Sequence, residues 1–570
     1  MCGIWGQIVN DIPEQLSSYV AINTKQAYEA CKTVQKRGPE RTNIKETSNY
    51  FLAFHRLAIN GLDESNDQPY VHIHPSNDTH KVIIMCNGEI YNFHELNKEL
   101  GTNTNCDTQI IWELYKDCDY NFHTLNQRLK GEYALAICIV DAQTSKPYRA
   151  FFSVDPCSVR PLFYSIDHST PNSPLSVTFS SLLAGVKHTQ HPQRLHGGQM
   201  LTVDFHAEKV HTDYYWDWNA TPPSLAEEDT NLLDIQFRLV YTLEACVKRR
   251  LTSDREIGCF LSGGLDSSIV AAIVAQNLAK IGKQLRTFSI GAPDSQDVKH
   301  AEIVAKHINS IHTNVPFRIE EGLTSLHDVM EATETFDITT IRASVGQFLI
   351  SKYIREHTDI KVVFSGDGAD EAEMGYLYFY NAPSDEAAQE ESVKLLREIH
   401  LYDGLRVDRC VSWHGLEARV PYLDEDFVSL MISIPAHLKR PIRDADAKGK
   451  EEKALLRHAF AKYRPSLLPS SVLFRTKETF SDSLSTETSD WYTKLKIFTL
   501  KGISLLGGRS NTFYLPPPSP EVAYYRYFFR EIFGEHCAQV IPHFWMPLWV
   551  KHTKGDPSAK QMDVYNEIAK

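Results

Sequence analysis

The sequence predicts a two-domain protein in which a β-rich α+β half precedes an α/β half with an open parallel sheet. At 570 residues, 42% of them apolar, the chain exceeds a single hydrophobic core. Short strands and turns dominate the first half, whereas strands and amphipathic helices alternate in the second. A polar, acidic stretch with Pro222-Pro223 separates them. We therefore expect domains at 2–205 and 231–545, a linker at 206–230 and a tail at 546–570.

The first half is predicted to form stacked β-sheets with helices outside. Turn clusters such as Asn60-Gly61 and Asn87-Gly88 separate its apolar runs, and helical periodicity is confined to about 25–35 and 108–117. The predicted strands are Phe51–Ala58, Val82–Cys86, Tyr133–Val140, Arg149–Val154, Leu175–Phe179 and Met200–Val203.

The second half alternates short apolar strands with long helices, which is typical of an open parallel sheet. Such a sheet binds its ligands at the carboxyl ends of its strands, where serine and glycine recur in this sequence. The predicted strands are Ile257–Leu261, Leu285–Ile290 and Lys361–Phe364, and the predicted helices are Leu232–Leu251, Ser267–Ile281, Asp297–Asn309 and Val345–Glu356.

Composition excludes several classes of protein. A net charge of −13 argues against a nucleic-acid partner, which requires a positive surface. The most apolar runs are too short for a membrane helix. The eleven cysteines form no Cys-x-x-Cys pair and follow no secretory leader, so we expect a cytosolic protein.

Residues 257–268 predict a phosphate-binding turn between a buried strand and a helix. Two glycines allow close backbone approach, Ser262 and Ser267 add hydroxyl donors, and Asp266 suits a magnesium ion. The Lys-Ser/Thr ending of a Walker loop is missing. A βα turn that merely needs small residues is the alternative. The string Ser-Gly-Gly-Leu-Asp-Ser-Ser, however, resembles the pyrophosphate loop of enzymes that adenylate a substrate.

The amino end carries a candidate nucleophile. Removal of Met1 would give Cys2 a free α-amine, which can act as base for its own thiol. A small packed residue is the alternative for a lone cysteine. Cys2 is nevertheless accompanied by the segments Arg37–Glu40, His55–Ile59, Asn87–Asn92 and by Asp107, and together they resemble the glutaminase half of class II glutamine amidotransferases.

This resemblance implies a role for each matching residue. Arg56 would hold the carboxylate of glutamine, Glu89 and Asp107 would hold its α-amino group, and Asn87 and Gly88 would donate to the oxyanion. A solvated arginine and a turn asparagine are the alternatives for single residues. The implied glutamine-binding residues are Arg56, Leu57, Ala58, Ile59, Asn60, Asn87, Gly88, Glu89 and Asp107.

Further segments of the second half suggest a nucleotide-dependent reaction on an acidic substrate. Ser365–Glu371 brings three carboxylates into one loop, which is either a solvated turn or a site for magnesium and a base. Arginines in 339–344 and 419–424 suit an acidic substrate, and Lys477 suits the developing pyrophosphate.

Together with Lys453–Arg457 and Trp545–Pro547, these motifs resemble the glutamine-hydrolysing asparagine synthetases from Cys2 to the 556–559 segment. The resemblance implies a layered αββα glutaminase sandwich of the Ntn-hydrolase type and an ATP-pyrophosphatase-type sheet. Catalysis would fall to Cys2, Asn87, Gly88, Asp367 and Lys477. The implied ATP-binding residues are Leu261, Ser262, Gly263, Gly264, Asp266, Ser267, Ile290, Ser365 and Gly366. The substrate aspartate would be bound by Thr340, Arg342 and Arg419. A magnesium ion would be bound by Asp266 and Asp370.

The expected reaction converts aspartate to asparagine through β-aspartyl-AMP, with ATP and with ammonia from glutamine. A homodimer is among the possible assemblies. A relative that adenylates another carboxylate, such as a β-lactam-forming synthetase, and a non-catalytic regulatory or binding protein are the alternatives. Release of pyrophosphate from ATP with aspartate would separate an enzyme from a non-catalytic relative.

The sequence also departs from the family pattern. Asp367 replaces a usual Glu, Glu40 a usual Asp, Val154 a usual Arg, and Leu182 and Ala184 a charged pair. The changes at 154, 182 and 184 put ammonia transfer in question more than either half-reaction. His72-Ile73-His74 could place two imidazoles on one face of a strand, but no partner ligand accompanies them, and surface histidines are the favoured interpretation.

Overall fold

The computed structural model describes residues 1–10, 22–75, 79–168, 174–218, 231–292, 295–442, 451–475, 491–506, 514–550 and 556–557. Its contacts divide the chain into two compact units, as the sequence predicts. The first unit is Met1–Asp217 with Ser412–Leu416 and Phe533–Val540, and the second is Trp218–Val411, Glu417–Ile532 and Ile541–Lys570. The described part of the expected tail belongs to the second unit, and the expected boundary at 545 stays a prediction.

The first unit contains two six-stranded antiparallel sheets, ordered β10-β8-β9-β1-β3-β2 and β12-β11-β7-β6-β5-β4. The six strands expected from the sequence are all present. The bounds are β1 Gly3–Val9, β2 Arg41–Glu46, β3 Tyr50–Arg56, β4 Tyr70–Ile73, β5 His80–Ile90, β6 Gly131–Asp141, β7 Pro147–Val154, β8 Phe163–Asp167, β9 Ser176–Ser180, β10 Gln193–Arg194, β11 Gln199–Asp204 and β12 Lys209–Tyr214.

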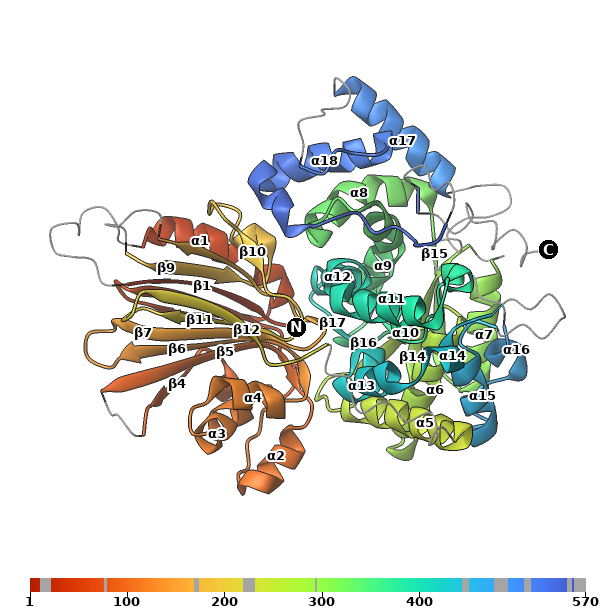
Figure 1. Cartoon of the computed structure of the whole chain (residues 1–570), viewed down its shortest axis with the longest axis horizontal. Helices are drawn as coiled ribbons and strands as arrows, with labels where there is room; N and C mark the ends of the chain where they lie inside the picture. The colour runs from red at the N-terminus through yellow and green to blue at the C-terminus, as the bar shows by residue number, and fades with distance from the viewer. Residues whose placement is uncertain are drawn as a thin grey trace. The chain divides into compact units, whose positions relative to one another are not determined.

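Three apolar clusters make this unit a four-layered αββα sandwich, as expected. One cluster lies between the two sheets and includes Ile4 and Phe152. The second joins the outer face of the β5-β6 sheet to helices α2 (Phe93–Leu100), α3 (Ile110–Asp117) and α4 (Phe122–Arg128). The third packs α1 (Thr24–Lys32) on the outer face of the other sheet, around Trp5. In Figure 1, α1 accordingly covers one side of the stack, and α2, α3 and α4 cover the opposite side.

Strand β6 shows why a long apolar run predicts a central strand here. Ala134 and Ala136 face the cluster between the sheets, whereas Tyr133 and Leu135 face the helices. Because both faces are covered, the strand is apolar without the alternation of a half-exposed strand.

Two expectations for the first unit are wrong. Residues 209–214, placed in the linker, form β12, which pairs with β11 at the edge of its sheet. Asn87 and Gly88, expected in a turn, lie within β5 and pair with β6. A Cβ on Gly88 would lie 2.0 Å from the Glu132 carbonyl oxygen, so glycine is needed there for the close approach of β6 rather than for a turn.

The second unit contains a five-stranded parallel sheet ordered β15-β14-β13-β16-β17. From β13 the chain continues outward to β14 and β15, and then returns to the other side of β13 for β16 and β17. This reversal creates a switch point between β13 and β16, where parallel sheets bind ligands. The bounds are β13 Ile257–Phe260, β14 Arg286–Gly291, β15 Ile311–Pro316, β16 Val362–Phe364 and β17 Glu417–Arg419.

Helices pack around this sheet, and the four expected ones appear as α5, α6, α7 and part of α9. No helix in the described stretches combines the length and the hydrophobicity of a membrane span. The bounds are α5 Leu232–Arg249, α6 Leu265–Lys280, α7 Gln296–His307, α8 Ile319–Thr333, α9 Ile338–His357, α10 Ala369–Ala372, α11 Asp385–Glu398, α12 Asp403–Ser412, α13 Glu425–Ser433, α14 Ala436–Lys439, α15 Ala454–Tyr463, α16 Ser470–Leu473, α17 Trp491–Leu505 and α18 Pro520–Phe533.

Candidate active sites

Cys2 is fixed from three directions in the first unit. Its backbone N–H donates to Asn87 Oδ1 at 2.9 Å, and its thiol lies 3.7 Å from the Leu57 carbonyl oxygen. The guanidinium of Arg37 donates to the Cys2 carbonyl at 3.1 Å. The thiol is thereby held beside Asn87 of β5 and the loop that follows β3.

The expected glutamine-binding residues lie on β5, at the end of β3 and in the loop that follows it, and at the turn before α3. Leu57, Ala58, Ile59 and Asn60 follow β3, Glu89 lies on β5 beside Asn87 and Gly88, and Asp107 begins a turn of 3₁₀-helix. Side chains connect them: Asn60 Nδ2 donates to Glu89 Oε2, and the Ile90 N–H donates to Asp107 Oδ2 at 2.7 Å.

Arg56 is buried and already bound to protein acceptors. Its guanidinium donates to Asp67 Oδ1 at 2.6 Å, to the Asp63 carbonyl at 2.7 Å and to the Asn60 carbonyl at 3.3 Å. A glutamine carboxylate would therefore have to share or replace one of these acceptors.

The departures from the family pattern in this unit have local structural causes. Glu40 Oε2 accepts the Ala58 N–H at 2.8 Å, so its longer side chain supports the loop beside Cys2. Val154 belongs to the apolar cluster between the sheets, and Leu182, with Ala184 against it, belongs to the cluster around Trp5. Apolar side chains at these positions thus extend the cores of the unit.

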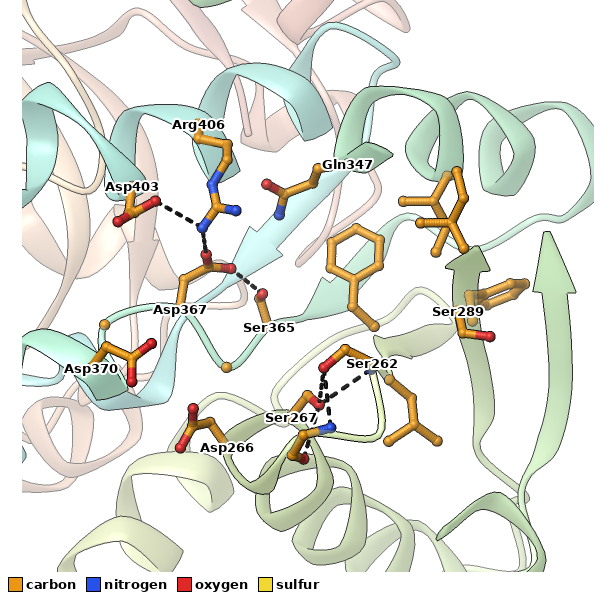
Figure 2. Close-up of a pocket in the computed structure, with 18 of the residues that line it drawn as sticks. Ser262, Asp266, Ser267, Ser289, Gln347, Ser365, Asp367, Asp370, Asp403 and Arg406 are labelled. Atoms are coloured by element: carbon orange, nitrogen blue, oxygen red, sulfur yellow. Dashed lines mark hydrogen bonds and ion pairs between the residues drawn. The ribbon is translucent and has the colours of Figure 1, made fainter. Parts of the chain in front are cut away.

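A cavity of about 170 Å³ lies in the second unit at the carboxyl ends of β13, β14 and β16. All the expected ATP-binding residues except Gly263 line it: Leu261, Ser262, Gly264, Asp266, Ser267, Ile290, Ser365 and Gly366. Asp367, Asp370 and Glu371 line it as well. Motifs that are far apart in the sequence therefore meet at the switch point of the sheet (Figure 2).

The loop between β13 and α6 has the geometry of an anion-binding turn. The Ser262 and Ser267 hydroxyl oxygens are 3.0 Å apart, and the Gly264 N–H donates to Ser262 Oγ at 3.3 Å. Gly263 has φ +76°, and a Cβ there would lie 2.5 Å from the Ala301 nitrogen of α7. The loop thus leads into the N-terminus of α6, where backbone N–H groups favour a phosphate.

Asp367 is held by two polar neighbours on the other wall. Arg406 Nη2 donates to Asp367 Oδ1 at 2.5 Å, and the Ser365 hydroxyl donates to Asp367 Oδ2. Burial raises the pKa of Asp367, and the Arg406 guanidinium opposes that rise. Arg406 also pairs with Asp403 at 3.0 Å, so the guanidinium joins two carboxylates beside the cavity (Figure 2).

Tyr376 lies between two further carboxyl groups. Its hydroxyl oxygen is 2.7 Å from Glu371 Oε1 and 2.8 Å from Asp403 Oδ2. One hydroxyl proton serves only one acceptor, so one carboxyl group is expected to carry its own proton. Burial, with the nearby charges of Asp403 and Asp370, raises the pKa of Glu371 well above its ordinary value.

Lys453 is a site residue that sequence reasoning missed. Its ammonium group bridges Asp266 Oδ2 at 2.6 Å and Asp370 Oδ1 at 2.5 Å, and its side chain is 3% exposed. The segment Lys453–Arg457 supported the family resemblance, but nothing in its pattern pointed to this cavity. The cavity is also lined by Arg406, Asp403 and Gln347. No sequence motif predicted a functional role for these three residues.

Asp266 and Asp370 can hold a magnesium ion only when a bound nucleotide and water supply the remaining oxygen atoms of its coordination shell. Within the described ranges, no group of three or more His, Cys, Asp and Glu side chains could hold a metal ion. Asp266 Oδ1 is nevertheless buried and has no hydrogen-bond partner there. Carboxylate oxygens from Asp266 and Asp370, together with phosphate oxygens and water, make the donor set that magnesium prefers.

The three residues that were expected to bind the substrate aspartate, Thr340, Arg342 and Arg419, lie outside this cavity. The Thr340 hydroxyl donates to Asp337 Oδ1 at 3.0 Å at the start of α9. Arg342 makes a bidentate pair with Glu521, at 2.8 and 2.7 Å, and also pairs with Asp556. Arg419 lies on β17 and bonds Glu417 at 2.9 Å and the Thr252 carbonyl at 2.6 Å.

None of these three lines the cavity, and their expected role in binding aspartate stays a prediction. Both arginines are instead hydrogen-bonded to protein acceptors. Lys477 lies outside the described residues. His72 stacks on Trp112 with ring centroids 4.3 Å apart, and the His74 ring lies tilted against Tyr120 with centroids 4.2 Å apart.

Comparison with known proteins covers the whole chain. A family model described as asparagine synthase matches residues 238–393 and 380–552, and a glutamine amidotransferase domain model matches residues 1–215. Glutamine-hydrolysing asparagine synthetases from Rattus norvegicus and Homo sapiens are 36% and 35% identical over 100% of this chain and of their own length. The Gallus gallus enzyme is 35% identical over 99% of both chains.

Among solved structures, the allosteric regulatory enzyme of purine biosynthesis is 15% identical to this chain, and the match covers 55% of this chain and 80% of that enzyme with a TM-score of 0.29. The full-length identity and both family models agree with the motifs around Cys2 and the Ser262–Ser267 loop. The chain therefore belongs to the glutamine-hydrolysing asparagine synthetase family.

Proposed function

We propose that this protein makes asparagine from aspartate, using ATP and ammonia released from glutamine. The observation that carries the proposal is that one chain, similar to asparagine synthetases over its full length, contains both the fixed Cys2 thiol and the loop-lined cavity of the second unit. Glutamate, AMP and pyrophosphate are the other products.

Glutamine hydrolysis is assigned to Cys2. Once Met1 is removed, the α-amine takes the thiol proton, and the sulfur attacks the side-chain amide carbon of glutamine. The amide C–N bond breaks with release of ammonia, and water then hydrolyses the thioester to glutamate. Asn87 and Gly88 stabilise the oxyanion, while Arg56, Glu89 and Asp107 bind the amino-acid end of glutamine.

Activation of aspartate is assigned to the cavity of the second unit. A β-carboxylate oxygen of aspartate attacks the α-phosphorus of ATP, the bond to the β-phosphate oxygen breaks, and pyrophosphate leaves. Ser262, Gly264 and Ser267 bind the phosphates at the N-terminus of α6. A magnesium ion held by Asp266 and Asp370 would neutralise charge on the leaving pyrophosphate.

Binding of aspartate is assigned to the Asp367–Arg406–Asp403 cluster in place of Arg342 and Arg419. Aspartate has one ammonium group and a second carboxylate, and this cluster offers both charges at the cavity. Ammonia then attacks the β-carbonyl carbon of β-aspartyl-AMP and displaces AMP. Activation is needed because a carboxylate oxygen is a poor leaving group, whereas AMP leaves readily.

We also propose a cytosolic, homodimeric protein. All eleven cysteines are free, which fits a reducing compartment. Light scattering after gel filtration would test the dimer.

The decisive experiment measures asparagine and pyrophosphate with ATP, aspartate and either glutamine or ammonium. The proposal predicts stoichiometric asparagine and pyrophosphate with either nitrogen source. Pyrophosphate with another carboxylic acid but not with aspartate would indicate a different substrate. No pyrophosphate under any condition would indicate a non-catalytic protein.

A further inference from the structure

Glu373 is a deeply buried carboxyl group that no motif explains. It follows α10, the helix that carries Asp370 and Glu371, and its side chain is 0% exposed. Neither of its carboxylate oxygens has a hydrogen-bond partner within the part of the chain described. Burying a carboxylate without hydrogen-bond partners lowers the stability of the folded protein, so a functional role for Glu373 is worth seeking.

Two buried lysines flank Glu373 without bonding to it. The Lys453 ammonium bridges Asp266 and Asp370, and its stem passes so close to Gly375 that an added Cβ would lie 2.2 Å from Lys453 Cε. The Lys439 ammonium donates to the Met431 carbonyl at 2.5 Å. Burial raises the pKa of Glu373 to about 8, and both ammonium groups oppose that rise, so both lie within electrostatic range of the carboxyl group.

Magnesium and Lys453 compete for the same oxygens. A divalent cation bound to Asp266 and Asp370 repels an ammonium group that contacts both carboxylates. Lys453 must then withdraw from at least one of them. A buried ammonium that loses its counter-charge costs several kcal/mol, unless another carboxylate receives it. The oxygens of Glu373, which have no hydrogen-bond partner among the described residues and lie within electrostatic range of Lys453, provide such an acceptor.

We propose that Glu373 is a positioning residue that receives the Lys453 ammonium when a divalent cation occupies Asp266 and Asp370. This inference rests on the proposed magnesium site. In the ligand-free protein, the Lys453 ammonium pairs with Asp266 and Asp370, and the Glu373 carboxyl group makes no hydrogen bond within the described residues. With the cation and ATP bound, Lys453 pairs with Glu373 and one aspartate, so that the ammonium stays beside the phosphates without blocking the cation.

The test measures direct binding of Mn²⁺, a paramagnetic substitute for Mg²⁺, by electron paramagnetic resonance of the full chain with ATP. Glu373→Gln keeps the shape of the side chain but removes its charge, and should weaken Mn²⁺ binding by about 10-fold or more, the usual effect of losing an outer partner at a metal site. Glu373→Asp keeps the charge and should stay close to wild type.

Two further variants sharpen the result. Glu391→Gln makes the same change at another buried glutamate of the second unit, which accepts a hydrogen bond from Tyr378, and should leave Mn²⁺ binding unchanged. Lys439→Met removes the competing ammonium, so Glu373 becomes more available to Lys453 and Mn²⁺ should bind more tightly. This variant also tests the proposal if Glu373→Gln fails to fold.

Two outcomes separate this inference from the proposed function. If wild type binds no Mn²⁺ with ATP, the proposed metal site is wrong. If wild type binds Mn²⁺ and Glu373→Gln binds it equally well, or Lys439→Met binds it less well, the role of Glu373 is overturned while the metal site stands. A lower melting temperature of ligand-free Glu373→Gln would also contradict the proposal, because Glu373 has no partner in that state.

Discussion

Adding one methyl group at Gly263 should disable the synthetase reaction. Gly263 lies in the loop between β13 and α6 with φ +76°, where an alanine costs about 1–2 kcal/mol of backbone strain. Its new Cβ would also lie 2.5 Å from the Ala301 nitrogen and 2.6 Å from the Asp297 carbonyl oxygen. Both atoms belong to the backbone of α7, so the loop itself must move.

The size of the effect follows from that displacement. Ordinary contact begins near 3.4 Å, so the loop must shift by about 1 Å, and a misplacement of this size costs about 100-fold in rate. Gly282→Ala is the matched control, because Gly282 has φ +71° but no atom within 4 Å of an added Cβ. It carries the same backbone strain without the clash.

The assay is pyrophosphate release from ATP and aspartate, with glutamine hydrolysis measured in parallel. Gly263→Ala should lose about 100-fold in the first reaction and nothing in the second. Gly282→Ala should be slightly less stable and fully active. Equal rates of pyrophosphate release for the two variants would refute the reasoning, because the clash would then have no consequence for the loop.

Three other perturbations test other parts of the molecule. Cys2→Ala should abolish glutamine hydrolysis but keep synthesis from ammonium; loss of both in a folded variant would contradict the assignment. Asp367→Asn should slow β-aspartyl-AMP formation by about 100-fold, because the Arg406 guanidinium loses one of its two paired carboxylates. Asp367→Glu should be neutral or harmful through crowding, and a large gain for this variant would mean that the Asp367 side chain is too short for full activity. Burial raises the pKa of Glu373 from 4.5 to about 8 in the folded state, so between pH 4.5 and 8 the folded protein binds a proton that the unfolded chain does not. The free energy of unfolding should therefore fall by about 1.4 kcal/mol for each pH unit of increase in this range. The difference between wild type and Glu373→Gln in urea unfolding should follow that slope, and a pH-independent difference would disprove the shift.

Local patterns in the sequence predicted the parts of the site that a single turn creates. Ser262, Gly264 and Ser267 lie within one strand–turn–helix segment, so their spacing alone indicates the anion-binding loop. Lys453 could not be found in this way, because it meets Asp266 across 187 residues of sequence. Such a pairing depends on how α15 packs against α5 and its neighbouring helices, which no local pattern encodes.

Arg342 illustrates the opposite limit. An arginine in a motif suits an acidic substrate by residue type alone, but the sequence does not reveal which carboxylates lie nearby. Glu521, 179 residues away, and Asp556, 214 residues away, accept hydrogen bonds from its guanidinium. Strand β12 was not predicted, for a different reason. All six of its residues are exposed, so its sequence lacks the full alternation of apolar and polar residues that marks a half-buried strand.

The strand order of the second unit also has a consequence for protein synthesis. Cys259 on β13 pairs with Phe364 on β16, so the two walls of the cavity are translated about one hundred residues apart. Closing a loop of that length and forming parallel strands are slow steps in folding. A nascent chain that has not reached β16 exposes the edge of β13, with its glycine loop, to the ribosome exit and to chaperones. Pauses in translation before Val362 should therefore lower the yield of folded enzyme more than pauses after Phe364.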